Sequence, residues 1–334
     1  MEEIYPDIFM ITETGTLGAL MPPVNLYVLS GDDGLIFDAG YGRQKILEHL
    51  GKEMNRIRSL VTSRGGKFNI TRALPSHTHP DHVSGLPYLK QTFGIKTILT
   101  DKMAASMTSR RHYYKKAADS GDGSGIVDRL ATNVVLKYFQ PALLGTRFTR
   151  DPDERIDENA ILSINGESWQ VLPAPGHCDD HIFLYHKNKG ILFSGDNIMR
   201  SVTTWLGPPR SDLEDYMRTL EEVLALPGLN LILSAHGSPI TDPRRRVAEL
   251  IAHRQERTRE VLAIIQNADK RGTSSRDILK TLYTGPDKQK RMFAEGWVRL
   301  TLDYLEKKRK ITRIRSGVGK RLYYRPADNF RRHP

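Results

Sequence analysis

Residues 76–85 (SHTHPDHVSG) constrain this chain more than any other stretch, because they place four side chains that commonly bind metals within six positions. These side chains are His77, His79, Asp81 and His82. In an extended segment residues two apart face the same side, so His77 and His79 can converge on one ion. Pro80 favours a first helical turn, which would bring Asp81 and His82 to a second ion nearby. The alternative, surface histidines beside a helix-capping Asp81, leaves all three histidines unexplained.

Three later segments each carry one further candidate ligand, just after an apolar run. They are His177 in PGH, Asp196 in SGD and His236 in AHG. Each lies beside a glycine or another small residue, which is typical of strand-end loops that deliver side chains to one place. The predicted ligands are His77, His79 and His177 for a first ion, Asp81, His82 and His236 for a second, and Asp196 between the two.

These ligand types indicate a hydrolytic metal centre. Zinc binds His nitrogen and Asp oxygen, and a catalytic zinc site keeps one position open for water. Two cations that share Asp196 would lower the pKa of a bridging water and so produce hydroxide near neutral pH. Asp81 could also accept or donate the proton during catalysis. We expect two divalent ions, with Zn²⁺ favoured, although iron and manganese suit the same ligands.

The roles of three further residues, His181, Cys178 and Asp38, follow from their neighbours in the sequence. His181 is either a supporting donor or substrate contact, and hence a catalytic candidate, or a strand-start histidine bonded to backbone. Cys178 has no partner for a nucleophilic dyad within its own segment. Asp38 ends an apolar run (GLIFD) and is a candidate for ordering a neighbouring loop.

Strand and helix patterns alternate along the first 243 residues and predict layered sheets flanked by helices. We expect an edge strand at 4–12, a hairpin at 24–30 and 34–38, a helix from about 44 to 52 and a buried strand at 68–75. Strands return from residue 161, and 212–226 has a helical period with Asp212 as a cap. Residues 101–150 break this rhythm and form a helical insertion that could cover a site, with Arg110, Arg111, Tyr113 and Tyr114 inside it.

Composition is that of an ordinary globular protein, with 39% hydrophobic and 27% charged residues among 334. The chain begins MEEIYPDIFM, with acidic residues where a secretory signal has basic ones. No apolar run approaches the roughly 20 residues needed to span a bilayer, so no membrane partner is expected. Cys178 is the single cysteine, which excludes an internal disulfide. Together these features predict a cytoplasmic location.

The positive charge is concentrated at the C-terminal end. Residues 244–334 hold 25 Lys and Arg against 10 Asp and Glu, a net +15, whereas residues 1–243 hold 25 against 29, a net −4. A long helix from 243 to about 269, two further helices and a basic hairpin around Gly317 and Gly319 predict a small winged-helix unit. The residues that could bind the phosphates of a nucleic acid are Lys307, Lys308, Arg309, Lys310, Arg313, Arg315, Lys320 and Arg321. Tyr323 and Tyr324 could stack on its bases. The alternative is that these residues only solvate a packing module.

The motifs resemble those of a known family. HTHPDH resembles the HxHxDH signature of the metallo-β-lactamase superfamily, and LIFDAG, PGH, SGD and AHG resemble its accompanying motifs in their usual order. The resemblance implies an α/β fold, a four-layer αβ/βα sandwich with the metals at one edge. PGHCDDH and IAHRQER are similar to segments of the β-lactamase-like protein 2 group, with Cys178 in place of a threonine. That group implies a catalytic domain at 1–243 and, at 244–334, a long helix plus a basic winged-helix domain.

We therefore expect a binuclear metal-dependent hydrolase that uses metal-bound hydroxide. The C-terminal charge favours phosphodiester cleavage in single-stranded nucleic acid, an activity that the resemblance implies for some members of the group. The alternative is a glyoxalase II-like hydrolase of small thioesters, esters or lactones. A third is a nucleic-acid-binding protein with a vestigial site. A homo-oligomer is left open.

Overall fold

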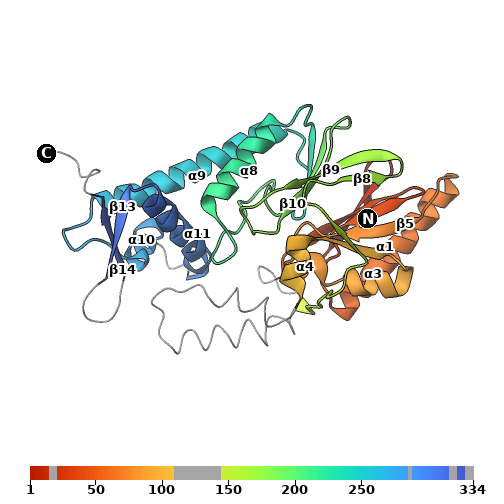
Figure 1. Ribbon diagram of the computed structural model, residues 1–334, viewed down its shortest axis with the longest axis horizontal. Coiled ribbons are helices and arrows are strands. Elements are labelled where there is room, and N and C mark those ends of the chain that lie inside the picture. Colours follow the sequence, from red (N-terminus) through yellow and green to blue (C-terminus); the bar gives the residue numbers. More distant parts are fainter. Residues whose placement is uncertain (15–20, 109–143, 285–287, 316–321, 328–334) are drawn as a thin grey trace.

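A computed structural model describes residues 1–14, 21–108, 144–284, 288–315 and 322–327 (Figure 1). Most of the predicted insertion, including Arg110, Arg111, Tyr113 and Tyr114, lies outside these residues. So do Lys320, Arg321 and the two glycines of the predicted basic hairpin.

The first sheet has seven strands in the order β1-β2-β3-β4-β5-β6-β7. Neighbours from β1 to β4 pair antiparallel, and those from β4 to β7 pair parallel. The strands are β1 Glu2–Tyr5, β2 Ile8–Glu13, β3 Val24–Leu29, β4 Gly34–Phe37, β5 Ile70–Leu74, β6 Lys96–Thr100 and β7 Glu154–Ile156. The predicted hairpin is confirmed as β3 and β4. The single strand predicted at 4–12 is wrong: Asp7, at φ 63°, turns the chain between β1 and β2, a conformation that Asp tolerates.

The second sheet has five strands in the order β12-β11-β10-β9-β8. Only the β11–β12 pair is parallel. The strands are β8 Ile161–Ile164, β9 Glu167–Pro173, β10 Ile182–His186, β11 Ile191–Gly195 and β12 Leu231–Ser234.

The two sheets face one another, and helices cover their outer sides (Figure 1). Along β10, Ile182 and Leu184 join the core between the sheets, whereas Phe183 and Tyr185 pack on the opposite side with α8 and α9. This alternation is the two-residue period of a strand buried on both faces. Among the described residues before 243, the helices are α1 Gln44–Ser63, α2 Pro80–Val83, α3 Leu86–Phe93, α4 Asp101–Met107 and α8 Leu213–Ala225. The expected αβ/βα fold is thus confirmed.

Helix α1 extends well beyond the predicted end near residue 52. Its buried residues Met54, Ile57 and Val61 continue the spacing of three to four that faces a core. Helix α8 has the predicted bounds, and the Asp212 side chain accepts a hydrogen bond from the backbone N–H of Asp215 at 2.9 Å.

The C-terminal part comprises α9 Pro243–Gln266, α10 Ser275–Leu282, α11 Lys288–Lys307, β13 Ile311–Arg315 and β14 Leu322–Pro326. Helix α9 belongs to two cores at once: Val247 and Leu250 pack with the second sheet and α8, whereas Val261 and Ile265 pack with α10 and α11. Two helices beside an antiparallel pair of strands agree with the predicted elements; the winged-helix assignment and the boundary at 243 stay predictions. Among the described helices, none combines the length and the apolar content needed to cross a membrane.

Candidate metal centre

The 76–85 stretch lies where β5 ends and the short helix α2 begins. Pro80 is the first residue of α2, and His79 precedes the helix with extended backbone angles, as the sequence predicts. The Asp38 carboxylate, from the end of β4, accepts a hydrogen bond from the backbone N–H of Ser76 at 2.7 Å. This contact fixes the start of the loop on the neighbouring strand.

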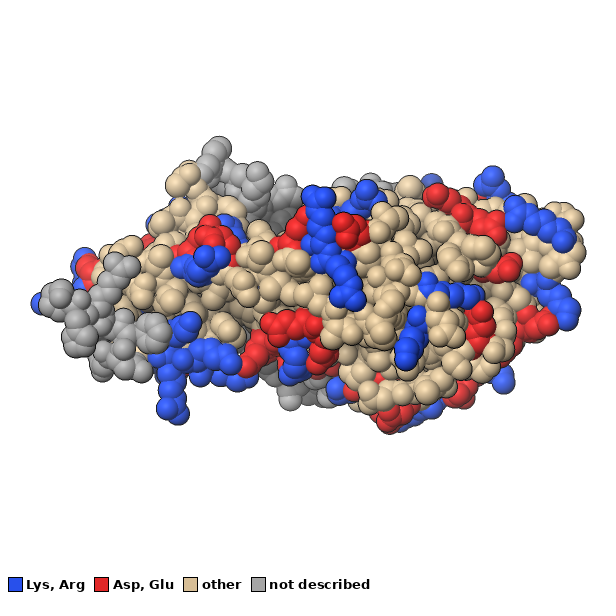
Figure 2. Space-filling view, turned by 90° about the horizontal axis from the view of Figure 1, so that it is seen from above, with Lys and Arg blue, Asp and Glu red and all other residues tan. Residues whose placement is uncertain are grey.

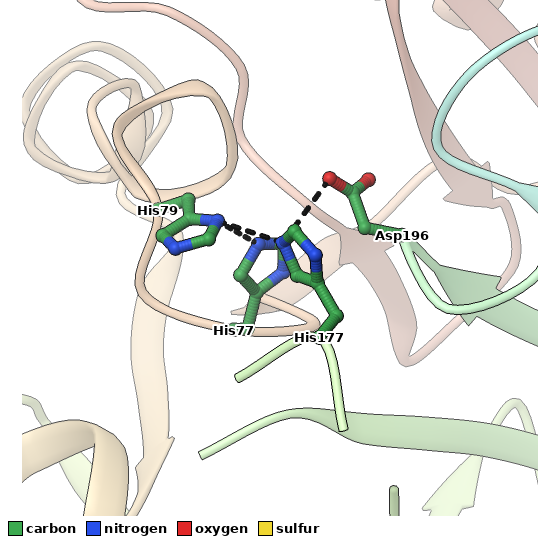
Figure 3. A group of neighbouring side chains, drawn as sticks. All are labelled: His77, His79, His177 and Asp196. Carbon is green, nitrogen blue, oxygen red and sulfur yellow. Dashed lines mark hydrogen bonds and ion pairs between the residues drawn. The ribbon is translucent and has the colours of Figure 1, made fainter. Parts of the chain in front are cut away.

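Three imidazoles converge in the first group (Figure 3). The Nδ1 atom of His79 lies 2.8 Å from Nε2 of His77 and 2.9 Å from Nε2 of His177. Asp196 completes the group, with its Oδ2 atom 3.5 Å from Nε2 of His177. His77 and His177 are buried, so the group lies inside the protein rather than on its surface.

The second group consists of Asp81, His82 and His236. Oδ2 of Asp81 lies 3.7 Å from Nε2 of each of the two histidines. Oδ1 of Asp196 lies 3.4 Å from Nε2 of His82 and 3.3 Å from Nε2 of His236. The two oxygens of Asp196 therefore face different groups, which places this carboxylate between them as the sequence predicts.

The outward nitrogens of these histidines are held by other parts of the chain. His77 Nδ1 lies 3.0 Å from Ser76 Oγ, and His82 Nδ1 lies 3.1 Å from Asp38 Oδ2. His177 Nδ1 lies 2.8 Å from the backbone oxygen of Trp205. His236 Nδ1 lies 2.5 Å from that of Pro23. Such partners fix the ring orientation of a metal-binding histidine.

Electrostatics differ between the two groups. Burial, together with the neighbouring imidazoles, lowers the pKa of His77 and of His79 well below the ordinary value. Burial also lowers the pKa of His177. At His82 and His236 burial also lowers the pKa, but the nearby carboxylates, which include Asp81 and Asp196, raise it by more. They raise the pKa of His82 well above its usual range and that of His236 to about 9.

The donor set fits divalent cations. Nε2 of His82 and Oδ1 of Asp196 are both buried and make no hydrogen bond, and leaving such atoms without a partner is costly. In the second group the protons favoured by the carboxylates would be displaced by a cation, since metal binding requires neutral imidazole. All seven predicted ligands lie in these two groups, and each offers an atom within 4.8 Å of the others in its group.

His181 lies behind Asp196 rather than among the converging atoms. Its Nε2 accepts a hydrogen bond from the backbone N–H of Asp196 at 3.2 Å, and Nδ1 lies 3.3 Å from Nδ2 of Asn197. Burial lowers the pKa of His181 to about 3, so the ring is neutral and suited to accept this bond. Of the two roles that the sequence allows, this geometry matches a strand-start histidine bonded to backbone, and the bond holds the segment that carries Asp196.

Arg210 links the loop that carries His77 and His79 to the loop that carries His177. No sequence motif indicated this role. Its guanidinium pairs with the carboxylate of Asp180 and donates a hydrogen bond to Thr78 Oγ1 at 2.9 Å. Thr78 in turn donates to Asp180 at 2.5 Å. The buried Cys178 thiol donates to the other Asp180 oxygen at 3.1 Å, and burial raises its pKa. Cys178 thus supports the loop, in agreement with the absence of a nucleophilic dyad expected from its segment.

Glu13 is a second residue that the sequence did not single out. The side chain is fully buried, and Oε2 accepts a hydrogen bond from the backbone N–H of Tyr41 at 3.0 Å. Burial raises its pKa well above the usual range. Gly40, at φ +70°, is required here because a Cβ atom would lie 2.1 Å from Glu13 Oε2. The buried Glu13 carboxyl therefore supports the loop that follows β4.

Comparison with known proteins gives a family for most of the chain. Residues 21–236 match the profile of the metallo-beta-lactamase superfamily. An Aspergillus fumigatus protein named atrochrysone carboxyl ACP thioesterase is 26% identical over 245 residues, which cover 73% of this chain and 60% of that protein. This chain thus spans less than two thirds of that relative. The beta-lactamase-like protein 2 homolog of Caenorhabditis elegans is 28% identical over 257 residues, 71% of this chain and 83% of that one.

Solved structures agree on the fold. A beta-lactamase domain protein from Burkholderia ambifaria has a TM-score of 0.74 at 21% identity and covers 98% of this chain and 93% of its own. A metallo-beta-lactamase family protein from Thermus thermophilus has a TM-score of 0.70, also at 21% identity, over 97% of this chain and 100% of its own. The similarity therefore includes the C-terminal part.

Proposed function

Since the chain belongs to the metallo-β-lactamase superfamily, we propose that it is a hydrolase that uses two divalent metal ions to cleave small thioesters or related esters. The two-ion site is supported by the position of Asp196, because its two carboxylate oxygens face two separate groups of ligand atoms. Zn²⁺ is the proposed metal, with iron or manganese as alternatives for the same donors.

The proposed ligands are His77, His79 and His177 for one ion, Asp81, His82 and His236 for the other, and Asp196 for both. Bound there, two cations supply Lewis acidity toward a carbonyl oxygen and activate water for attack. Asp38, Ser76 and His181 hold the ligands in place. Asp81, whose side chain is 18% exposed while His82 is fully buried, is the proposed group that accepts and returns a proton.

The choice of a thioester rests on two observations. Two relatives, including the Aspergillus fumigatus protein, carry the name atrochrysone carboxyl ACP thioesterase. In addition, several basic residues expected to follow phosphates are paired with carboxylates. Glu214 on α8 binds Lys307 at 2.5 Å and Lys308 at 2.7 Å. Arg313 binds Asp303 and Glu306.

Cleavage of single-stranded nucleic acid is the second candidate, favoured by the net +15 charge of residues 244–334. Besides the paired cations, the burial of one of the two predicted stacking residues argues against it, although Tyr323 is only half-buried. Tyr324, expected to be available for stacking, is only 3% exposed and packs in the C-terminal core. We keep a cytoplasmic location as part of the proposal.

A substrate panel tests the proposal. Metal-loaded protein is assayed on an acyl-thioester, an ester, a lactone and single-stranded RNA, alongside the variants His77→Ala and Asp196→Ala. We expect thioester turnover in the unmodified protein and its loss in both variants. Asp303→Asn, which removes a carboxylate far along the chain from every proposed ligand, serves as the matched control and should keep full activity.

Two outcomes count against the proposal. RNA cleavage at low salt without thioester turnover would replace it with the second candidate. Salt-sensitive RNA binding that survives both active-site variants, with no turnover of any substrate, would instead support a binding protein.

A further inference from the structure

A cavity of about 380 Å³ lies between the catalytic part and the C-terminal helices. One wall is the segment 203–206, which follows β11, and the other comes from α9, α11 and the residue after α10. The residues that matter for its chemistry are Thr204, Trp205, Arg254, Tyr283 and Trp297. Three aromatic side chains and one arginine thus line a single space, none of them assigned to metal binding.

Arg254 is an unusual wall residue because it is a buried cation. It is only 5% exposed, and its Nη2 atom donates a hydrogen bond to the backbone oxygen of Thr204 at 3.0 Å. Its guanidinium lies 5.8 Å from the centre of the Tyr216 ring, but in the described part of the chain no carboxylate pairs with it, and its Nε makes no hydrogen bond. Burying a charge without a counter-charge is costly, so an anion in the adjoining cavity would relieve a cost already present.

Arg257, one turn further along α9, shows the contrast. It binds Glu260 at 2.6 Å and the Tyr283 hydroxyl at 2.6 Å, and its guanidinium lies 4.8 Å from the centre of the Trp297 ring. The charge of Arg257 is therefore compensated, and the residue orients two aromatic walls of the cavity. Of the two arginines, Arg254 is the one left to receive an anion.

Two residues of the cavity wall, Thr204 and Trp205, contact His177 of the first group of metal ligands. Thr204 Oγ1 lies 3.0 Å from His177 Nδ1, on the same residue whose backbone oxygen binds Arg254. The Trp205 ring is 46% exposed, and its centre lies 6.4 Å from that of the His177 ring. A molecule that packs on Trp205 is therefore about one side chain away from a proposed metal ligand.

We propose that this cavity binds a planar aromatic anion, an aryl carboxylate or aryl phosphate, with its acidic group at Arg254 and its ring against Trp205 and Trp297. Aromatic walls favour a flat ring, and a buried arginine favours a carboxylate or phosphate. When the anion is part of the substrate, the cavity selects thioesters whose aromatic ring also carries a free acidic group. This second step rests on the proposed thioesterase function; the binding itself does not.

Calorimetric titration of the full, metal-loaded chain tests the binding. The probes are 1-naphthoate, 1-naphthyl phosphate and the neutral 1-naphthylmethanol. We expect at least one anion to bind about tenfold or more tightly than the neutral probe, because a hydrogen bond to a charged group is stronger than one between neutral groups. Tenfold corresponds to about 1.4 kcal/mol. The tighter of the two anions identifies the acidic group.

Variants locate the bound anion. Arg254→Gln should weaken anion binding at least tenfold, whereas Arg259→Gln, which removes an exposed cation from the same helix, should not. Trp205→Ala, at an exposed side chain, provides the second test where Arg254→Gln does not fold. The titration is repeated with Asp196→Asn, in which direct binding of the anion to metals is impaired.

The proposal is overturned when the anions bind no more tightly than the neutral probe, when Arg254→Gln and Trp205→Ala both bind normally, or when binding is lost only in Asp196→Asn. Failure of the thioesterase function gives a different pattern, with Arg254-dependent anion binding but no thioester turnover. Failure of the cavity proposal alone leaves turnover intact, with equal kcat/KM for aromatic-acid and neutral acyl-thioesters.

Discussion

The metal centre and the C-terminal part both concentrate ionisable residues, yet they differ in where these residues find partners. In the centre, seven side chains from several separate segments direct their atoms inward at one another, and two of these atoms, on His82 and Asp196, are buried without a hydrogen bond. In the C-terminal part, basic residues pair with acidic ones at the surface, as Lys307 and Lys308 do with Glu214. The first arrangement calls for a ligand from outside the chain, whereas these surface ion pairs do not.

Opposite charges also lie close together on the surface of the molecule. On the face drawn in Figure 2, basic and acidic side chains stand close to one another. Lys307 and Lys308 hold the pKa of Glu214 down to about 2, so this carboxylate is ionised and matches their charge at neutral pH. A count of charges along the sequence therefore overstates the attraction that this region offers to an anionic polymer.

The largest expected effect is that of Asp196→Asn, which removes a negative charge shared by both ligand groups. We expect kcat/KM for the thioester to fall about a thousandfold, which corresponds to several kcal/mol of lost transition-state stabilisation. Asp303→Asn makes the same chemical change in the C-terminal part, where the carboxylate only pairs with Arg313. Equal losses in both variants would erase the contrast between the two regions.

The next largest effect is expected for Asp180→Asn, which should lower the free energy of unfolding. Asp180 is 1% exposed and pairs with Arg210, and breaking a buried ion pair costs about 3 kcal/mol. Although burial acts in the opposite direction, Arg210 and Thr78 lower the pKa of Asp180 below its ordinary 3.8. Its contribution is thus present above pH 3.8 and lost as the pH falls below it. Urea unfolding at several pH values should show the variant's deficit at pH 7 and a smaller one near pH 3; a deficit independent of pH would exclude this account.

Asp38→Ala should weaken metal binding without removing a ligand. The Asp38 carboxylate orients His82 and the start of the ligand loop, and loss of such a partner typically costs about 10–100-fold in metal affinity. Competition with a chromophoric chelator measures the affinity. Retention of the unmodified protein's affinity would show that the loop needs no support from β4.

The smallest effect is expected for the double variant Lys307→Ala/Lys308→Ala. Exposed ion pairs contribute little, so kcat/KM for the thioester should stay within about twofold. The paired lysines should also make no difference to retention on immobilised single-stranded RNA at 0.15 M salt. A clear loss of retention would show that these lysines bind phosphates despite their contact with Glu214.

Sequence alone predicted which side chains converge in the two groups because their signals are local. His77, His79, Asp81 and His82 lie in one turn of chain, and His177, Asp196 and His236 each follow a strand beside a small residue. Asp38 was identified by the same logic. These patterns depend on strand ends that meet at one edge of a sandwich, and the fold provides that edge.

What the sequence did not indicate depends on contacts between distant segments. Arg210 lies 30 residues beyond Asp180, and nothing near either residue predicts their pairing. The burial of Tyr324 follows from packing against α9 and from backbone hydrogen bonds to Thr273, which no strand period specifies. Arg254 was part of a recognised run, IAHRQER, but only the fold places it against Thr204 and so beside the metal centre.

We infer that Asp196 joins two metal sites, and anomalous diffraction at the zinc absorption edge from crystals of the zinc-loaded protein would locate both ions. We predict two peaks, one among His77, His79 and His177 and one among Asp81, His82 and His236, with Asp196 in contact with both. A single peak, or two peaks of which only one touches Asp196, would contradict the claim.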